Sequence, residues 1–175
     1  FGGSCLPKDL RGLTYRARTL DIDTPVLAAT MASNQLQIGR AFDLIAATGR
    51  KRIGVLGLAF KSGTDDLRES PMVTLIERLI GRGFEITIFD RDVRNASIVG
   101  SNREYVEREI PHIWELMRAS TDAVLEAADV VVIGNGSAEF REILPRLRPE
   151  QRVVDLVRIF GDRVSDGVTY EGICW

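Results

Sequence analysis

Three residues near the start of the chain could carry out chemistry on a bound substrate. Cys5 directly precedes a segment with helical spacing, Lys8 lies three residues later, and Asp9 follows it. A helix N-terminus and a nearby cation favour the nucleophilic thiolate form of cysteine, and a carboxylate one turn away can order a water molecule or accept a proton. Gly2 and Gly3 would let a substrate approach the backbone closely. These residues alone leave two interpretations open, a reactive Cys5 or a buried and inert one.

A second polar segment, GLAFKSGTDDLRESP, follows an apolar stretch that is typical of a buried strand. It carries Lys61 and Arg68 and leads into a helix that Ser70 can cap. Cations near a helix N-terminus form an anion site, which suits a phosphorylated ligand. The alternative is a solvated turn in which Asp65 and Asp66 pair with the two cations. The sequence favours neither interpretation over the other.

The other strand ends offer weaker candidates. Only Gly57 lies at the turn after the first strand, whereas the dinucleotide fingerprint needs three glycines. Asp90 resembles a ribose-binding acid, but it lies 33 residues beyond Gly57 rather than about 20. We therefore expect this domain not to hold a dinucleotide in the standard way. Residues 134–137 and 155–158 are candidate ligand edges, for which ordinary loops are the favoured interpretation.

The composition argues against several classes of function. The chain has 175 residues, 45% of them hydrophobic and 27% charged, with a net charge of -2. No basic patch dominates, so we expect no nucleic-acid partner. Every apolar run is far shorter than the roughly 20 residues of a membrane helix, and no signal peptide is visible. We expect a cytoplasmic protein that does not bind membranes.

The cysteines and the histidine show no metal-type spacing, so we expect no metal site. Cys5 and Cys174 lie near opposite ends of the chain. A disulfide between them is conceivable, but a reduced cytosolic chain is the favoured interpretation. His112 has no cysteine nearby, and we interpret it as a structural or surface residue.

The spacing of apolar residues divides the chain into two parts. Residues 1–49 are predicted to be helical, with one helix after Cys5 and a longer one over 25–48 that Gly49 ends. The longer helix would span about 37 Å, so we expect it to pack against a second copy or against a part outside this sequence. Residues 50–175 alternate strand and helix, which predicts a doubly wound parallel α/β domain. The expected strands are 52–60, 84–90, 130–135 and 152–159; the expected helices are 70–83, 104–109, 122–129 and 137–147.

The segment FGGSCLPKD around Cys5 resembles the active-site cysteine segment of the nucleotide-sugar 6-dehydrogenases, the UDP-glucose and GDP-mannose dehydrogenase family. GLAFKSGTDDLRESP resembles the second signature of that family, at about the expected distance downstream. The resemblance implies that residues 1–49 form the active-site loop and a central helical dimerisation region. It also implies that residues 50–175 form a Rossmann-like nucleotide-sugar-binding domain. The NAD-binding Rossmann domain that comes first in this family has no counterpart in the chain.

The resemblance implies a mechanism in which the sugar C6 alcohol is oxidised to an acid with two NAD per turnover. Cys5 would attack the intermediate aldehyde to give a thiohemiacetal, and the second oxidation would leave a thioester that water hydrolyses. Asp9 matches the aspartate that helps to handle that water. Gly2, Phe60 and Lys61 match residues that bind the nucleotide-sugar, while Lys8 and Arg68 match residues near NAD.

The closest resemblance, with GNG at 134–136 and EGICW at the C-terminus, is to the branch that converts GDP-mannose to GDP-mannuronate for alginate-type polymers. It implies a homodimer or higher homo-oligomer that assembles through the long helix. Because the NAD fingerprint is missing, we expect the 175-residue chain to be inactive alone. Two alternatives stay open: a fragment of a UDP-glucose 6-dehydrogenase, or a nucleotide-binding assembly domain without catalysis.

Overall fold

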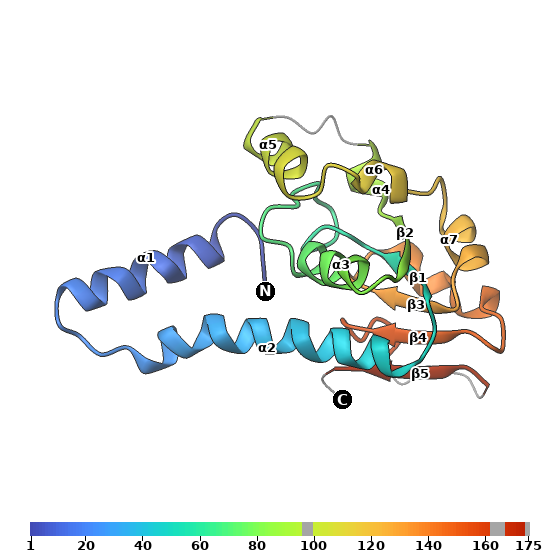
Figure 1. Cartoon of the computed structure of the whole chain (residues 1–175), viewed down its shortest axis with the longest axis horizontal. Coiled ribbons are helices and arrows are strands. Elements are labelled where there is room, and N and C mark those ends of the chain that lie inside the picture. Colours follow the sequence, from blue (N-terminus) through green and yellow to red (C-terminus); the bar gives the residue numbers. More distant parts are fainter. Residues whose placement is uncertain (96–99, 162–166, 174–175) are drawn as a thin grey trace.

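A computed structural model describes residues 1–95, 100–161 and 167–173. Five parallel strands form one sheet in the order β2-β1-β3-β4-β5 (Figure 1). The predicted doubly wound parallel sheet is confirmed. The order reverses between β1 and β3, and ligands of such sheets bind beyond the carboxyl ends of the strands near that reversal. The strands are β1 (Arg52–Leu56), β2 (Glu85–Phe89), β3 (Val130–Ile133), β4 (Arg152–Asp155) and β5 (Thr169–Gly172).

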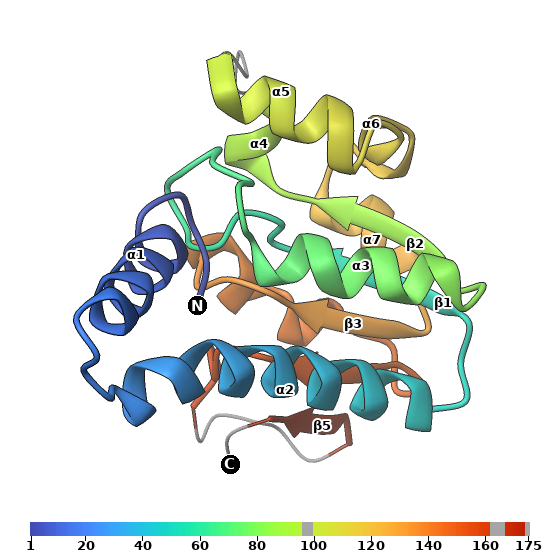
Figure 2. The same cartoon turned by 60° about the vertical axis from the view of Figure 1, so that its left-hand side comes forward.

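Helices cover both faces of the sheet. The central strands are apolar on both sides, so both faces must be buried. Strand residues alternate between two buried clusters, because successive side chains of a strand point to opposite faces. Ile53 and Val55 pack in the cluster that includes residues of α2 (Pro25–Ala47) and α3 (Pro71–Gly81), which lie together on one face (Figure 2). The second cluster includes Val131 and residues of α7 (Thr121–Ala127).

The start of α3 is built by its sequence. Pro71 stands in the first turn, where its missing N–H costs nothing. The hydroxyl of Ser70 accepts a hydrogen bond from the Met72 amide at 3.3 Å and donates one to the Leu58 carbonyl at 2.8 Å. The predicted cap is therefore confirmed. The same buried hydroxyl also fixes the start of α3 to the segment that leaves β1.

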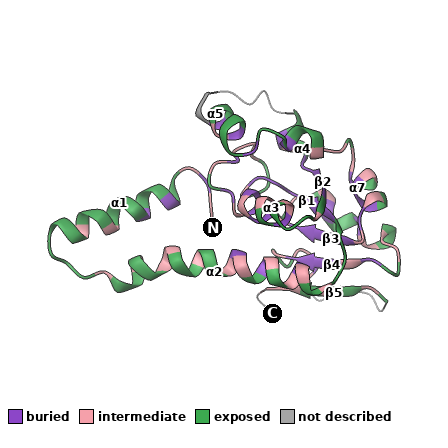
Figure 3. Cartoon of the chain, viewed as in Figure 1, coloured by how far each residue is buried: buried purple, intermediate pink, exposed green. Residues whose placement is uncertain are grey.

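The two N-terminal helices form an arm that extends from the α/β domain (Figure 1). The second half of α2 is part of the core, where Ile38 and Ile45 are buried. Its first half lies beside α1 (Leu6–Thr19), and most of this arm is exposed (Figure 3). Leu6, Leu10 and Leu13 lie at helical spacing in α1. Leu10 is buried, whereas the side chains of Leu6 and Leu13 are more than half exposed.

Three regions differ from the sequence-based expectation. Residues 137–147 form two 3₁₀ helices, η1 (Ala138–Glu142) and η2 (Leu144–Arg146), because Pro145 cannot sit inside an α-helix. The short edge strand β5 escaped prediction, since its half-exposed residues show no buried run. Residues 91–117 contain more helix than the one predicted over 104–109. They form α4 (Arg91–Asn95), α5 (Gly100–Glu109) and α6 (Ile113–Leu116).

No helix in the described part of the chain is long and apolar enough to span a membrane.

Candidate functional site

Cys5 lies at the head of α1, with its side chain free and exposed. It occupies the N-cap position, and its carbonyl accepts a hydrogen bond from the Asp9 amide at 2.9 Å. Its Sγ lies 3.8 Å from the Ser4 Oγ. The interpretation of Cys5 as a buried cysteine is therefore wrong. The thiol stands where a substrate could reach it.

The loop that carries Cys5 docks on the polar segment after β1. The ring of Phe60 covers Gly3, which has a φ of +90°, and a Cβ at Gly3 would lie 2.8 Å from the Phe60 Cζ. Gly2 packs against the start of α3, since a Cβ there would lie 2.6 Å from the Pro71 Cδ. Only glycine allows this close approach. The two motifs that the sequence places 55 residues apart, at Cys5 and Phe60, thus form one surface.

Arg68 and Asp66 form an ion pair within this segment. The Arg68 Nε and Nη2 donate to the two Asp66 carboxylate oxygens, both at 2.8 Å. Arg68 holds the pKa of Asp66 below its ordinary value, and the Ser4 hydroxyl contributes a smaller lowering. The pKa of Arg68 is raised mainly by Asp66, with a Coulomb contribution from Cys5. Arg68 and Ser4, the residue before Cys5, thus meet at the same Asp66 carboxylate.

Lys61 is exposed, and its Nζ lies 5.5 Å from the centroid of the Phe60 ring. The two sequence-based interpretations of this segment therefore each describe part of it. Arg68 is paired with an aspartate, as the solvated-turn interpretation predicted. Lys61 is presented to solvent beside Phe60, at the carboxyl edge of the sheet where an anion could bind.

Lys8 and Asp9 lie in the first turn of α1, on the solvent side of Cys5. The Lys8 Nζ is 3.0 Å from the Asp9 Oδ1, and both side chains are more than half exposed. The hydrogen bond to Asp9 raises the pKa of Lys8 above its ordinary value, and Cys5 adds a small Coulomb contribution. The structure therefore brings Cys5, Lys8 and Asp9 together on one helical turn.

Asp90 has a structural role rather than the ribose-binding role that its position suggested. Its buried carboxylate accepts hydrogen bonds from the amides of Leu58 and Ala59, at 2.8 and 3.1 Å, and from the Asn135 side chain. Gly57 has a φ of +93°, and a Cβ there would lie 2.6 Å from the Asn135 Cγ. The Leu58 and Ala59 amides are therefore bonded within the chain, and Asn135 occupies the space beside Gly57. That this domain does not hold a dinucleotide in the standard way stays a prediction.

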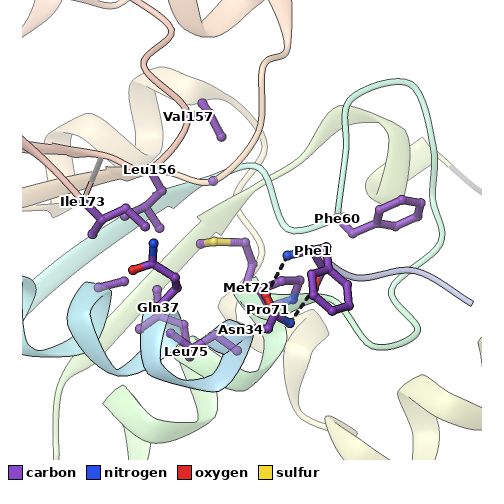
Figure 4. Close-up of a pocket in the computed structure, with 13 residues that line it drawn as sticks. Phe1, Asn34, Gln37, Phe60, Pro71, Met72, Leu75, Leu156, Val157 and Ile173 are labelled. Atoms are coloured by element: carbon purple, nitrogen blue, oxygen red, sulfur yellow. Dashed lines mark hydrogen bonds between the residues drawn. The ribbon is translucent and has the colours of Figure 1, made fainter. Parts of the chain in front are cut away.

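A cavity of about 210 Å³ opens at the carboxyl edge of the sheet, between α2, α3 and the ends of β3 and β4 (Figure 4). Both loops noted as candidate edges contribute to it, through Gly134 and through Leu156 and Val157. Asn34 in α2 also lines the cavity and bonds both main-chain polar atoms of Phe1, at 2.7 and 2.9 Å. Sequence reasoning missed Asn34, because a polar residue in an amphipathic helix reads as solvent-exposed. The lining residues are Phe1, Asn34, Gln37, Ile38, Ala41, Phe60, Pro71, Met72, Leu75, Gly134, Leu156, Val157 and Ile173.

The remaining candidate site residues are His112, which lies away from the carboxyl edge of the sheet, and Cys174, which lies outside the described residues. His112 is exposed just before α6, in agreement with a surface role. Cys174 lies outside the described residues, so the expectation of a reduced chain without a disulfide to Cys5 stays a prediction. Among residues 1–95, 100–161 and 167–173, no group of three or more His, Cys, Asp or Glu side chains is placed to hold a metal.

The fold and the site together define a class of protein: a doubly wound α/β domain whose helical arm presents a thiol to a polar loop at the ligand-binding edge. Residues 54–162 match the UDP binding domain of the UDP-glucose/GDP-mannose dehydrogenase family, and residues 1–36 match its central domain. The chain belongs to the UDP-glucose/GDP-mannose dehydrogenase family.

Similar proteins of known name support this assignment. The chain is 48% identical over its whole length to the GDP-mannose 6-dehydrogenase of Pseudomonas aeruginosa, and 32% identical over 90% of its length to the UDP-glucose 6-dehydrogenase of Rickettsia typhi. It superposes over its full length on a crystal structure of a GDP-mannose dehydrogenase ternary complex from Pseudomonas aeruginosa, with a TM-score of 0.90. A UDP-glucose dehydrogenase from Pyrobaculum islandicum gives 0.77 at 27% identity. The chain spans 40% of the length of the GDP-mannose relatives.

Proposed function

We propose that this chain is the part of an NAD-dependent GDP-mannose 6-dehydrogenase that carries the nucleophile and binds the nucleotide-sugar. The enzyme would oxidise GDP-mannose to GDP-mannuronate, the type of precursor used for alginate-like polymers. One observation carries the proposal: the exposed Cys5 docks, through Gly2 and Gly3, on the loop that presents Lys61. The names of the most similar relatives support the choice of sugar.

Cys5 is the proposed nucleophile. Its sulfur adds to the carbonyl carbon of the C6 aldehyde, the new C–S bond gives a thiohemiacetal, and the carbonyl oxygen takes up a proton. The aldehyde would arise when the C6 alcohol loses its hydroxyl proton and a hydride. The thioester would arise when the thiohemiacetal loses its hydroxyl proton and a second hydride, and NAD would accept each hydride. Water then attacks the resulting thioester, and the thiolate leaves as the acid forms. Covalent capture keeps the reactive aldehyde on the enzyme between the two oxidations.

The residues near Cys5 are proposed to bind the nucleotide-sugar and the cofactor and to orient the hydrolytic water. Asp9, one turn from Cys5, orders the hydrolytic water and takes its proton. Lys61 and Phe60 bind the nucleotide-sugar at the carboxyl edge of the sheet, and Gly2 leaves room for the sugar. Lys8 and Arg68 face the cofactor of the complete site, which the described residues do not hold. Phosphate oxygens suit an exposed lysine beside a helix N-terminus.

We further propose that residues 1–49 form the active-site loop with the dimerisation region, and that residues 50–175 form the nucleotide-sugar domain. Val26, Ala29, Ser33 and Leu36 are exposed on α2 and repeat at intervals of three and four residues. This is the spacing of a helix-pairing seam. A second copy of the chain, packed on α2, would cover it. A cytoplasmic location stays a prediction of the sequence.

The nucleophile is tested by Cys5→Ser in the complete enzyme. We expect acid formation to fall by at least about 10³-fold, since a hydroxyl without an activating base is a weak nucleophile. Mass spectrometry of the quenched wild-type reaction should find an acyl adduct on Cys5. The exposed Ser62→Ala in the same loop serves as the control and should retain activity. Wild-type rates in Cys5→Ser would contradict the assignment.

The sugar is tested by calorimetric titration of this chain with GDP-mannose and with UDP-glucose. We expect tighter binding of GDP-mannose, and we expect Lys61→Ala to weaken it. Tighter binding of UDP-glucose would favour the UDP-glucose 6-dehydrogenase alternative. A folded sample that binds neither ligand, and that nevertheless self-associates, would favour an assembly domain without catalysis.

A further inference from the structure

Glu69 contacts the chain on both sides of Cys5, and the site as described gives it no role. Its main-chain carbonyl oxygen lies against Gly2, where a side chain would have no room. Its carboxylate accepts two hydrogen bonds from Arg11 in α1, from Nη1 at 3.2 Å and from Nη2 at 2.5 Å. One residue of the second motif therefore holds the segment before the cysteine and the helix after it.

The backbone of Glu69 is itself in an unusual conformation. Its φ is +54°, in the left-handed region that residues with a side chain rarely adopt. Residues on both sides fix this conformation, since Ser70 caps α3 and Arg68 is paired with Asp66. Strained residues persist where their surroundings determine them, and they gather at functional sites. The direction in which Glu69 presents its carboxylate is thus set by a rigid turn.

We propose that Glu69 is a positioning residue that, through Arg11, holds Cys5 at a fixed place relative to Arg68. A bidentate pair between a guanidinium and a carboxylate fixes orientation as well as distance. Both side chains are about half exposed, and such pairs add little to global stability. The effect should therefore appear in the reactivity of Cys5 rather than in folding. This inference rests on the proposed function only in taking Cys5 as the nucleophile.

The first test measures how fast iodoacetamide alkylates Cys5 at neutral pH in the wild type and in Glu69→Gln, with Cys174 counted separately by peptide mass spectrometry. Removing a negative charge near a thiol would by itself favour the thiolate and speed alkylation. If Cys5 instead moves away from the Arg68 guanidinium, its thiolate is less favoured and alkylation is slower. We expect alkylation to be at least threefold slower in Glu69→Gln. An unchanged or faster rate would overturn the proposal.

The second test exchanges the two charges. Arg11→Glu alone should slow alkylation of Cys5, and the double variant Arg11→Glu with Glu69→Arg should restore the wild-type rate to within twofold. The matched control is Arg52→Gln, because Arg52 and Asp129 form an equally bidentate pair, at 3.0 and 2.5 Å, beside the amino ends of the strands. The control should not change the rate. A double variant as slow as the singles, in samples with wild-type circular dichroism, would overturn the pairing.

The third test uses kinetics of the complete enzyme. Glu69→Gln should lower kcat at least tenfold while KM for the nucleotide-sugar stays within twofold, because the residue positions the nucleophile and does not bind the substrate. An unchanged kcat in a variant with slowed alkylation would overturn the positioning role in catalysis. A fully active Cys5→Ser enzyme would contradict the proposed function instead, and slowed alkylation in Glu69→Gln would still support the positioning of the thiol.

Discussion

At the scale of single residues, the charged side chains near Cys5 are paired with one another. The carboxylate of Asp66 is paired with the Arg68 guanidinium. The same carboxylate also interacts with the hydroxyl of Ser4, the residue before Cys5. Lys8 and Asp9 pair with each other in solvent, where such a pair exchanges readily with water. The ion pair between Asp66 and Arg68 is therefore the fixed electrostatic element beside the thiol.

We predict that Asp66→Asn lowers the free energy of unfolding at neutral pH by about 1–2 kcal/mol, because hydrogen bonds between charged groups contribute about that much. The pKa of Asp66 is lower in the folded state than its ordinary value of 3.8. The carboxylate therefore stabilises the fold above that ordinary value, and this stability is lost as the pH falls through the lower folded-state pKa. Urea titrations across this acid range measure the effect.

The control for this prediction is Glu107→Gln, which removes an exposed pair with Arg103 in α5. We expect it to change the free energy of unfolding by less than about 0.5 kcal/mol. The wild type and Asp66→Asn should converge in stability at low pH. A difference between them that stays constant with pH would contradict the assignment to this carboxylate.

At the scale of elements, the turn after β1 is held by buried polar side chains from the ends of the two neighbouring strands. Asp90, at the end of β2, accepts hydrogen bonds from the amides that begin the next segment. Asn135, after β3, fills the space beside Gly57. Three strand ends are thus joined by one buried polar network. Gly134, which precedes Asn135, lines the cavity between α2, α3 and the ends of β3 and β4.

We predict that Gly57→Ala lowers the free energy of unfolding by at least about 2 kcal/mol. The left-handed backbone alone costs about 1–2 kcal/mol for a residue with a Cβ, and the added methyl group would displace Asn135 from Asp90. Gly81→Ala is the matched control, because that glycine lies in α3 with nothing within 4 Å of a built Cβ. The control should be neutral or stabilising by up to about 1 kcal/mol. Equal effects in guanidinium titrations of the two variants would contradict this account.

At the scale of the whole molecule, the arm carries most of the large apolar side chains that the described residues expose. Eight of the ten large hydrophobic side chains that the described residues expose lie within residues 1–36. Contiguous apolar surface of this kind marks an interaction site. The α/β domain, by contrast, buries its strands on both faces. We therefore propose that a second copy of the chain covers the arm.

We predict that the chain is a dimer at micromolar concentration and that the double variant Val26→Glu with Leu36→Glu is a monomer. Both side chains are well exposed, at 78% and 66%, so the change should disturb an interface rather than the core. Light scattering and sedimentation measure the mass. Trp114→Glu, which alters an exposed apolar residue on α6, should stay dimeric. A monomeric wild type would contradict the prediction.

The sequence by itself determined the order of most elements, the Ser70 cap of α3 and the two motifs. These follow from local rules, such as the alternation of strand residues or Pro71 after Ser70, that need no distant contact. The tertiary structure alone decided how the motifs meet. Gly3 under Phe60 and Glu69 bound to Arg11 join segments more than 50 residues apart, through contacts that no local pattern encodes. The exposure of Cys5 was decided in the same way, because burial depends on what packs against a residue in space.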